Sequence, residues 1–586
     1  MAREIDHGLR AATLALDCCE ITGLGIAVFS GVLPNFYLRL MSRLGWLILI
    51  GLLVLASVAP LLGDRWLRPA EKFAARLAAR KRTALIAIAL AAILARLAVL
   101  WLFPVPVPAV HDEFSYLLAG DTFAHGRLTN PPHPMWIFLD TFHELQQPTY
   151  MSIFPPAQGA VLALGQLLGH PWIGVLLSVA FMCAAVTWML QGWFPPEWAL
   201  LGGVFVLLRL GLFTYWVNSY WGGAVAAIGG ALVVGAFPRI IHRQRIRDSL
   251  LLGIGAAVLV NSRPLEGFIF CLPVAVALGV WLFSGTSPGF GIAAPRVLLP
   301  ALCVLAATIL FVLYDNWRVT GSALLLPHAL YMRQQCNCPV FAWQKPNLPL
   351  HYLNAQFDYY YNVGIRRQYI PTFAGWKHRS EVWITGMWHF FFGAIVSISF
   401  VTLPWVLRDR RMRLLWVQFC LSAASLLAVV YLEAHYIAPL VATMFALWVQ
   451  SMRHLRRGRV FGRTVGLGLT RVIVLAALLN LPIFLVQRAR NAETEAVPWS
   501  IDRDRMVKQL DATPGLHLAI VRYSPDRTIQ NEWVYNAADI DRSKIVWARE
   551  IPGLDLQPLL TYFRDRDVWL VEADASPPRL QRYPGP

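Results

Sequence analysis

The chain has 586 residues, of which 57% are hydrophobic and only 15% are charged, and its formal net charge is +17. An average soluble domain is about 45–50% apolar and about 25% charged, so this composition excludes an ordinary soluble enzyme. The apolar content excludes a disordered chain, and 8 cysteines are too few for a disulfide-built scaffold. A multi-pass membrane protein remains, provided that the apolar residues form runs long enough to span a bilayer.

The apolar residues do form such runs, each close to the 20 or so residues that a spanning helix needs. The long runs are 44–63, 83–103, 171–192, 196–214, 220–238, 267–284, 296–315, 386–407, 414–431 and 467–487. Two shorter runs, 249–261 and 437–451, each lie beside another apolar helix and are also predicted to cross. A run at 14–35 is interrupted by Asp17 and Glu20. The sequence therefore predicts an all-α multi-pass membrane protein with twelve or thirteen transmembrane helices.

Four short loops contain much of the positive charge: 64–82, 239–247, 408–413 and 453–463. Lys and Arg concentrate in short cytoplasmic loops, and placing all four inside leaves an even number of spans between each pair. Because the basic residues lie in separate loops rather than in one patch, we expect no nucleic-acid partner.

Three polar segments then fall outside: 104–155, 316–385 and 488–586. In the last segment, HLAIVRY (517–523) and DVWLVEAD (567–574) are typical of short buried strands, and 555–566 is typical of an amphipathic helix. We predict a small extracytoplasmic α/β domain there. The expected division is an N-terminal membrane and cytoplasmic extension (1–82), a transmembrane catalytic domain (83–487) and the outer domain (488–586).

The most informative segment is HDEFSYLLAGDTFAHGRL (111–128), which follows a predicted span directly. Asp112 and Glu113 are adjacent carboxylates at the boundary between membrane and water. One carboxylate could remove a proton from an attacking hydroxyl while the other orients it. The alternative is a hydrated helix start, where a carboxylate is stabilised by the helix dipole.

Further motifs carry a resemblance to a known superfamily. The Asp-Glu pair is followed by a Pro-Pro helix start, FPPAQGAVLALGQLLG (154–169), and later by SRPLEG (262–267), DNWRVTG (315–321) and EAHYIAPL (433–440). This order resembles the GT-C glycosyltransferases, and most closely the branch of protein O-mannosyltransferases and lipid A aminoarabinose transferases. The last motif departs from the pattern because His435 stands where the branch has Arg. The resemblance covers about residues 83–487.

The resemblance implies an inverting glycosyltransferase that moves a hexosyl or pentosyl group from a polyprenyl-phosphate carrier to a hydroxyl. The acceptor would be a glycan, lipid or protein, and the site would lie on the outer face of a bacterial inner membrane. By position, Asp112 would be the general base and Glu113 its partner. A polytopic transporter or flippase for a lipid-linked or envelope substrate is the alternative, although the absence of an internal repeat disfavours it.

A departing phosphate needs cations nearby, and Arg263, His435 and Tyr436 are the candidates. The alternatives are that Arg263 pairs with Glu266 and that Tyr436 anchors the helix in the membrane interface. We expect the largest outward cavity to be lined by Asp112, Glu113, Arg263 and the 433–440 segment.

Three more residues are candidates for binding substrate: His111, Arg366 and Arg367, the last two following the aromatic run FDYYYN (357–362). Solvated loop charges are an equal alternative for the two arginines.

No metal centre or cofactor is expected, because zinc sites need about four ligands at recognisable spacing. A divalent cation held by oxygen ligands stays open. The spacing of Cys336 and Cys338 allows a strained disulfide, free thiols or the remnant of a metal site.

Overall fold

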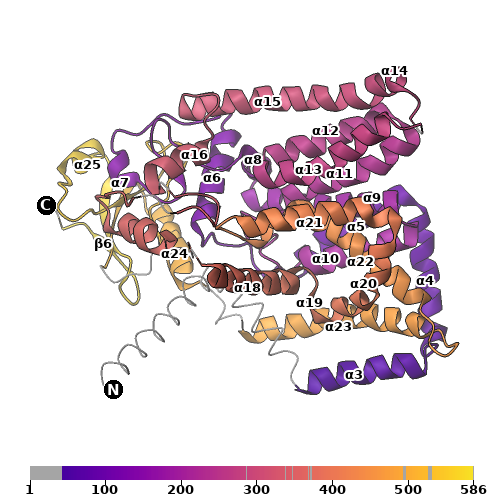
Figure 1. Cartoon of the computed structure of the whole chain (residues 1–586). Coiled ribbons are helices and arrows are strands. Elements are labelled where there is room, and N and C mark those ends of the chain that lie inside the picture. Colours follow the sequence, from indigo (N-terminus) through magenta and orange to yellow (C-terminus); the bar gives the residue numbers. More distant parts are fainter. Residues whose placement is uncertain are drawn as a thin grey trace, which may run out of the picture.

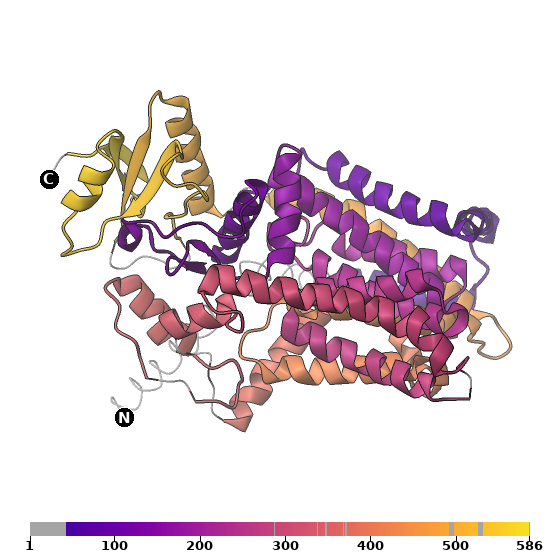
Figure 2. The ribbon, with the colours of Figure 1, turned by 90° about the horizontal axis from the view of Figure 1, so that it is seen from above.

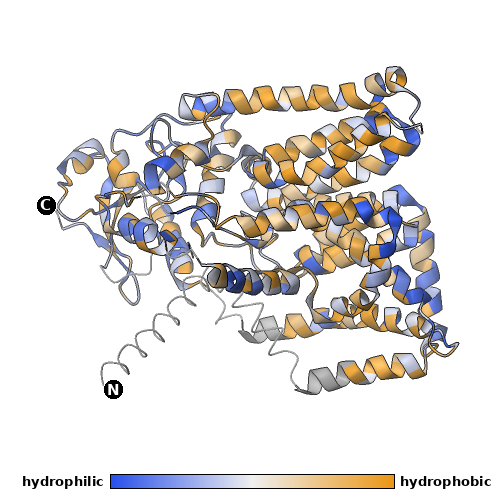
Figure 3. Cartoon of the chain, in the orientation of Figure 1, coloured by the Kyte–Doolittle hydropathy of each residue, from blue (hydrophilic) through white to orange (hydrophobic). Residues whose placement is uncertain are grey.

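The computed structural model describes residues 43–584 apart from 286, 337, 346–347, 367–368, 370–371, 492–496 and 525–530. The run at 14–35 and Arg367 lie outside the described residues. Long helices run side by side along one direction, with the small sheet at one end of them (Figure 1). Figure 3 shows that the middle of these helices is apolar and that polar residues gather towards both ends.

Every predicted span from 44–63 onwards falls on helical structure. The helices of the bundle are α3 (Arg43–Val58), α5 (Lys81–Ala98), α9 (Pro171–Trp193), α10 (Pro196–Leu210), α11 (Ala224–Arg243), α12 (Ile246–Val260), α13 (Pro264–Leu282), α14 (Phe290–Ala293), η1 (Ala294–Leu298), α15 (Leu299–Thr320), α18 (Phe373–Phe391), α19 (Gly393–Ser397), η5 (Ile398–Thr402), α20 (Leu403–Arg408), η6 (Arg410–Met412), α21 (Arg413–Ala428), η7 (Ala434–Leu440), α22 (Val441–Arg457) and α23 (Val465–Asn491).

Within the described residues, five helical segments are long and apolar enough to cross a membrane by themselves. They are α9, α11, α13, Phe290–Thr320 and Val465–Val486. A sixth span results if α18 and Gly393–Arg408, which meet at a bend of 92°, count as one. The chain is thus a multi-pass membrane protein, and the remaining crossings stay a prediction because those helices are shorter or more polar.

Residues 104–155 and 316–385, which the sequence predicts to lie outside and which are called the first and second outer segments below, form short elements at the sheet end of the bundle. They are α6 (His111–Ala124), α7 (Trp136–Leu139), β1 (Glu144–Leu145), β2 (Met151–Ser152), α16 (Pro327–Tyr331), η2 (Met332–Cys336), α17 (Ala355–Phe357) and η3 (Asp358–Ile365). The helix α8 (Pro156–Leu167) follows the first of them directly. Cys336 and Cys338 are joined by a disulfide. Of the three possibilities that their spacing allows, the structure therefore has the disulfide rather than free thiols or the remnant of a metal site.

Two glycines place α6, the helix that begins with the His-Asp-Glu triplet, directly against α8. A Cβ atom on Gly159 would lie 2.6 Å from the Cβ of Ala119, and one on Gly120 would lie 2.9 Å from the Cβ of Leu162. Any larger residue at either position would separate the helices. The second half of α6 is therefore packed tightly against α8.

The C-terminal region forms the expected mixture of helix and sheet. Its elements are α24 (Pro498–Ala512), β3 (His517–Arg522), β4 (Ile545–Arg549), α25 (Gln557–Tyr562), β5 (Asp567–Glu572) and β6 (Arg579–Arg582). The two strands and the helix predicted from the sequence are confirmed as β3, β5 and α25. The strand order is β4-β3-β5-β6, with β3 parallel to both neighbours and β6 antiparallel to β5.

The sheet packs on the first outer segment through a shared hydrophobic core. Leu118, Phe138 and Tyr150 of the outer segment are buried in the same cluster as Leu518 and Ile520 of β3. Burial of side chains from both segments removes apolar area from water and stabilises their contact.

The guanidinium of Arg549, at the end of β4, connects the sheet to both outer segments. It donates to Glu532 Oε2 at 2.7 Å, to the Asp140 carbonyl oxygen at 3.4 Å and to Gln356 Oε1. The Glu532–Arg549 pair is closed to solvent, with side-chain exposures of 0% and 3%.

Candidate active site

The first turn of α6 gives its two carboxylates different surroundings. Glu113 is 2% exposed, and its carboxylate accepts hydrogen bonds from the backbone N–H groups of Ala109 (2.8 Å), Val110 (3.1 Å) and Tyr220 (3.0 Å). Burial raises the pKa of Glu113 to about 7, although these hydrogen bonds oppose the increase. Glu113 thus fixes the helix start to the loop before α11.

The carboxylate of Asp112 turns instead towards His143, a residue that sequence reasoning missed. Asp112 Oδ1 lies 2.5 Å from His143 Nδ1, and the side chains are only 15% and 20% exposed. His143 has a left-handed backbone (φ 62°), and its N–H donates to the Tyr331 hydroxyl at 2.7 Å. This geometry aims the imidazole at Asp112 and leaves the pair near solvent.

The aromatic run of the second outer segment closes over this pair. The Tyr360 hydroxyl lies 3.5 Å from His143 Nε2, and Tyr361 hydrogen-bonds to Tyr331. FDYYYN therefore lines the Asp112 site through its tyrosines.

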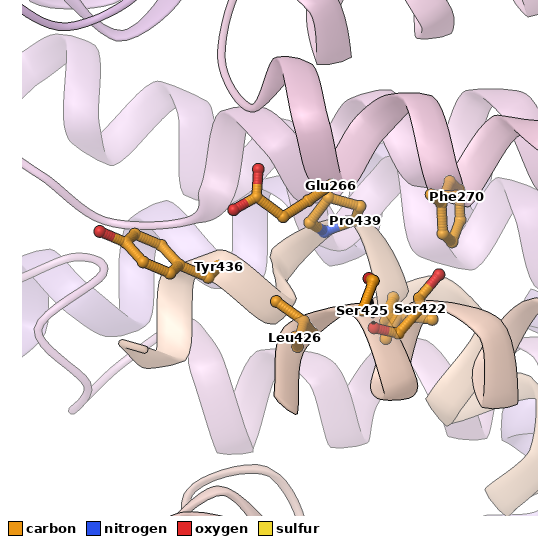
Figure 4. A pocket seen from close by; sticks show the side chains of 8 residues that line it. Glu266, Phe270, Ser422, Ser425, Leu426, Tyr436 and Pro439 are labelled. Carbon is orange, nitrogen blue, oxygen red and sulfur yellow. Dashed lines mark hydrogen bonds between the residues drawn. The ribbon is translucent and has the colours of Figure 1, made fainter. Parts of the chain in front are cut away.

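Arg263 sits just before α13 and faces the start of η7. Its guanidinium carbon lies 4.2 Å from the centre of the Tyr436 ring, a distance typical of a cation–π contact. Figure 4 shows that Tyr436 and Glu266 face a common space. Burial opposes an increase in the pKa of Arg263, but the negative charges of Tyr436 and Glu266 help to raise it.

Glu433 provides the electrostatic link between Asp112 and Arg263. Burial and the negative charge of Asp112 raise the pKa of Glu433 to about 8, while the charge of Arg263 opposes the shift. Arg263 contacts the 433–436 turn through Tyr436, and the charge of Asp112 acts on Glu433 of the same turn.

His435, in the same turn, belongs to the packed core. Its Nδ1 lies 2.9 Å from the Tyr215 hydroxyl and its ring centre 4.7 Å from that of Trp221, and the residue is 1% exposed. This placement favours a role in holding the turn over the direct phosphate contact expected from the sequence.

His111 lies between the bundle and the C-terminal region. Its Nδ1 is 2.6 Å from the Tyr535 hydroxyl. The Tyr535 ring stacks on Phe114 at 3.8 Å, and the Arg503 guanidinium lies 5.1 Å from the Phe114 ring centre. The C-terminal region therefore completes the wall behind the helix that contains Asp112.

Arg366 lies farther along the second outer segment. Its Nε and Nη2 atoms are buried without a hydrogen-bond partner in the described part of the chain. The positive charge of Arg366 opposes the increase in pKa that burial causes for Tyr352 and Tyr369. Both tyrosines belong to a hydrophobic cluster of that segment. A substrate contact by Arg366 stays a prediction.

A small pocket of about 10 Å³, with room for about one water molecule, lies next to the Arg263–Tyr436 contact (Figure 4). It is lined by Glu266, Phe270, Ser422, Ser425, Leu426, Tyr436, Pro439 and Leu440. The lining mixes polar and apolar side chains of α13, α21 and η7, with Tyr436 and Ser422 on opposite sides of the pocket (Figure 4). Three of these residues belong to the predicted 433–440 lining, whereas Asp112, Glu113 and Arg263 do not line this pocket.

The described residues hold no group of three or more His, Cys, Asp or Glu side chains arranged to bind a metal ion.

Comparisons with known proteins found no matching family model and no matching curated protein. Among solved structures, the Archaeoglobus fulgidus oligosaccharyltransferase in complex with Zn and sulfate has a TM-score of 0.41 and 13% identity, over 75% of this chain and 60% of that chain. The A. fulgidus oligosaccharyltransferase AglB with an inhibitory peptide and a dolichol-phosphate has a TM-score of 0.37 and 12% identity, over 75% and 62%. The chain spans about 60% of these proteins, and similarity at this level assigns neither a family nor an activity.

Proposed function

We propose that the chain is a glycosyltransferase of the GT-C type, which transfers a sugar from a polyprenyl-phosphate donor to an acceptor hydroxyl on the outer face of the membrane. The observation that supports this proposal is the Asp112 carboxylate held by His143, together with the Arg263–Tyr436 contact beside the small pocket of α13, α21 and η7. A carboxylate base and a cation are two groups that transfer from a lipid-phosphate sugar donor requires.

Asp112 is the proposed general base. His143 donates its Nδ1–H to Asp112 Oδ1 and fixes the carboxylate, so that the second oxygen can accept the proton of the acceptor hydroxyl. Glu433, with a pKa of about 8, is mainly protonated at neutral pH. Of these two carboxylates, Asp112 is then the one that can take up a proton.

The transfer is a single in-line displacement. The acceptor oxygen forms a bond to the anomeric carbon as its proton moves to Asp112, and the bond from that carbon to the phosphate oxygen breaks with its electron pair. The polyprenyl phosphate leaves with the added negative charge, which Arg263 and the Tyr436 hydroxyl stabilise. One displacement inverts the configuration at the anomeric carbon.

The other predicted site residues take positioning roles in this proposal. Glu113 holds the start of α6, His435 holds the turn before α22, and His111 contacts the C-terminal region through Tyr535. The branch of the superfamily, the sugar and the acceptor follow the sequence resemblance and are part of the proposal.

The test is a transfer assay on the purified full chain in vesicles with a polyprenyl-phosphate sugar and extracted envelope acceptors. We expect release of polyprenyl phosphate together with a glycosylated acceptor, and loss of both in Asp112→Asn. Glu381→Gln, at an exposed carboxylate of α18 (62% exposed), is the matched control and should keep full transfer. Movement of the donor across the bilayer without any transfer would refute the proposal in favour of a flippase.

A further inference from the structure

The helix between α3 and α5, α4 (Asp64–Ala79), differs in direction from the rest of the bundle. In Figure 1 it runs across the axis of the long helices, at the end opposite α6, α7 and α16, and Figure 2 shows the same region from above. A helix across the end of a membrane-spanning bundle runs parallel to the membrane surface. It therefore lies at the level of the lipid headgroups.

The acidic side chains of α4 attach it to the bundle. Asp64 and Glu71 lie 3.0 and 3.1 Å from the Arg471 guanidinium of α23, and Glu71 lies 3.0 Å from Arg456 at the end of α22. Arg471 is only 6% exposed. Both acids of α4 therefore face the protein, and the opposite sides of the helix face outwards.

Two large aromatic side chains project from α4 away from the bundle. Trp66 is 74% exposed and Phe73 is 69% exposed, and they lie seven residues apart, or about 20° from each other around a helix with 3.6 residues per turn. Aromatic side chains of this kind insert at the boundary between headgroups and acyl chains.

Three basic residues occupy a separate stripe of the same helix. Arg65, Lys72 and Arg76 are exposed and form no ion pair with any described residue. Successive residues of a helix are rotated by roughly 100° around its axis. The three basic side chains therefore lie within about 40° of one another around the axis, and their stripe lies about 90° from that of Trp66 and Phe73. The helix thus has a protein face, an aromatic face and a cationic face.

We propose that α4 is a binding site for anionic phospholipids, with Arg65, Lys72 and Arg76 on the phosphate headgroups and the two aromatic side chains among the acyl chains. The charge complementarity favours this occupant, because the acids of α4 are already used inside the protein and leave an uncompensated cationic stripe. Each cation near an anionic membrane surface strengthens binding about fivefold. Three of them predict a preference of roughly a hundredfold for anionic over zwitterionic lipid.

The test uses the purified full chain in detergent, titrated with phosphatidylglycerol or phosphatidylcholine, with retained lipid counted by native mass spectrometry. We expect the wild type to retain phosphatidylglycerol preferentially and the triple variant R65Q/K72Q/R76Q to lose most of that preference. The variant R65K/R76K keeps every charge and should bind as the wild type does. A wild type that retains both lipids equally would overturn the proposal.

A second triple variant controls for the change in net charge. R542Q/R564Q/R579Q removes three exposed arginines of the C-terminal region, and we expect it to retain phosphatidylglycerol as the wild type does. Equal loss in both triple variants would show that overall charge, not α4, attracts the lipid, and loss in R65K/R76K would exclude charge as the cause.

Discussion

Replacing Arg549 by Met should loosen the C-terminal sheet, because it removes a buried guanidinium from a carboxylate. Glu532 and Arg549 have side-chain exposures of 0% and 3% and a separation of 2.7 Å. Breaking a buried ion pair by removing one partner costs about 3–5 kcal/mol. Glu532 Oε1 still accepts from the backbone N–H groups of Trp533 and Val534. We therefore expect Arg549→Met to lower the free energy of opening the sheet by about 3 kcal/mol, at the lower end of this range.

Hydrogen exchange measures this loss in the full chain. A loss of about 3 kcal/mol raises the population of the open sheet roughly a hundredfold, so the amides of β4 in Arg549→Met should exchange faster by that factor while those of α9 remain unchanged. Arg522→Met is the matched control, because it removes an arginine of the same sheet from the exposed pair with Glu550 (48% and 24% exposed). Exposed pairs contribute about 0–1 kcal/mol.

A double variant separates the charge effect from the loss of contacts. Glu532→Gln together with Arg549→Met removes both charges and should recover part of the protection that Arg549→Met loses. Exchange in Arg549→Met that is no faster than in Arg522→Met would refute the reasoning.

Three further predictions concern the candidate site. His143→Phe should lower kcat at least about tenfold with KM for the lipid donor unchanged, since it removes the orienting donor of Asp112; unchanged kcat in steady-state assays would contradict this. Arg263→Met should raise KM for the donor about tenfold or more, which donor titration measures, and Arg263→Lys should recover part of the loss. The pKa of Glu113 is raised from 4.5 to about 7 by burial, so the folded state favours its neutral form. Its contribution to stability is full below pH 4.5 and is lost as pH rises through 7, by roughly 3 kcal/mol in total. Glu113→Gln should therefore show a smaller fall in thermal midpoint between pH 5 and pH 8 than the wild type, and equal falls would refute the assignment.

The sequence could predict the elements whose signal is local. Long apolar runs predicted the helical segments, and short apolar runs predicted the C-terminal strands. Each of these elements is buried along its own length, so its apolar residues are close together in the sequence. The alternative interpretation of the Asp-Glu pair, a hydrated helix start, is correct in that α6 begins at His111 but wrong for Glu113, which is 2% exposed. Asp112 and Glu113 have separate environments because adjacent residues of a helix point in different directions.

Contacts between distant segments could not be predicted in the same way. His143 follows Asp112 by 31 residues, and its approach depends on a left-handed backbone in an irregular segment, which no periodicity indicates. The turn at 433–436 was recognised by its motif, but the motif does not tell which side chain faces the site. The structure turns His435 into the core and Tyr436 towards Arg263.

The Asp112→Asn variant tests the central claim most directly. Asp112 follows the first residue of α6 without a capping hydrogen bond from its side chain, which instead lies 2.5 Å from His143. Loss of a general base lowers the rate by about 10²–10⁴-fold. The account therefore predicts that kcat for sugar transfer falls by that factor, while expression and binding of the polyprenyl-phosphate donor remain as in the wild type. Near-normal transfer by a well-expressed Asp112→Asn chain would contradict it, since Asn is tolerated at a helix start but cannot accept the proton.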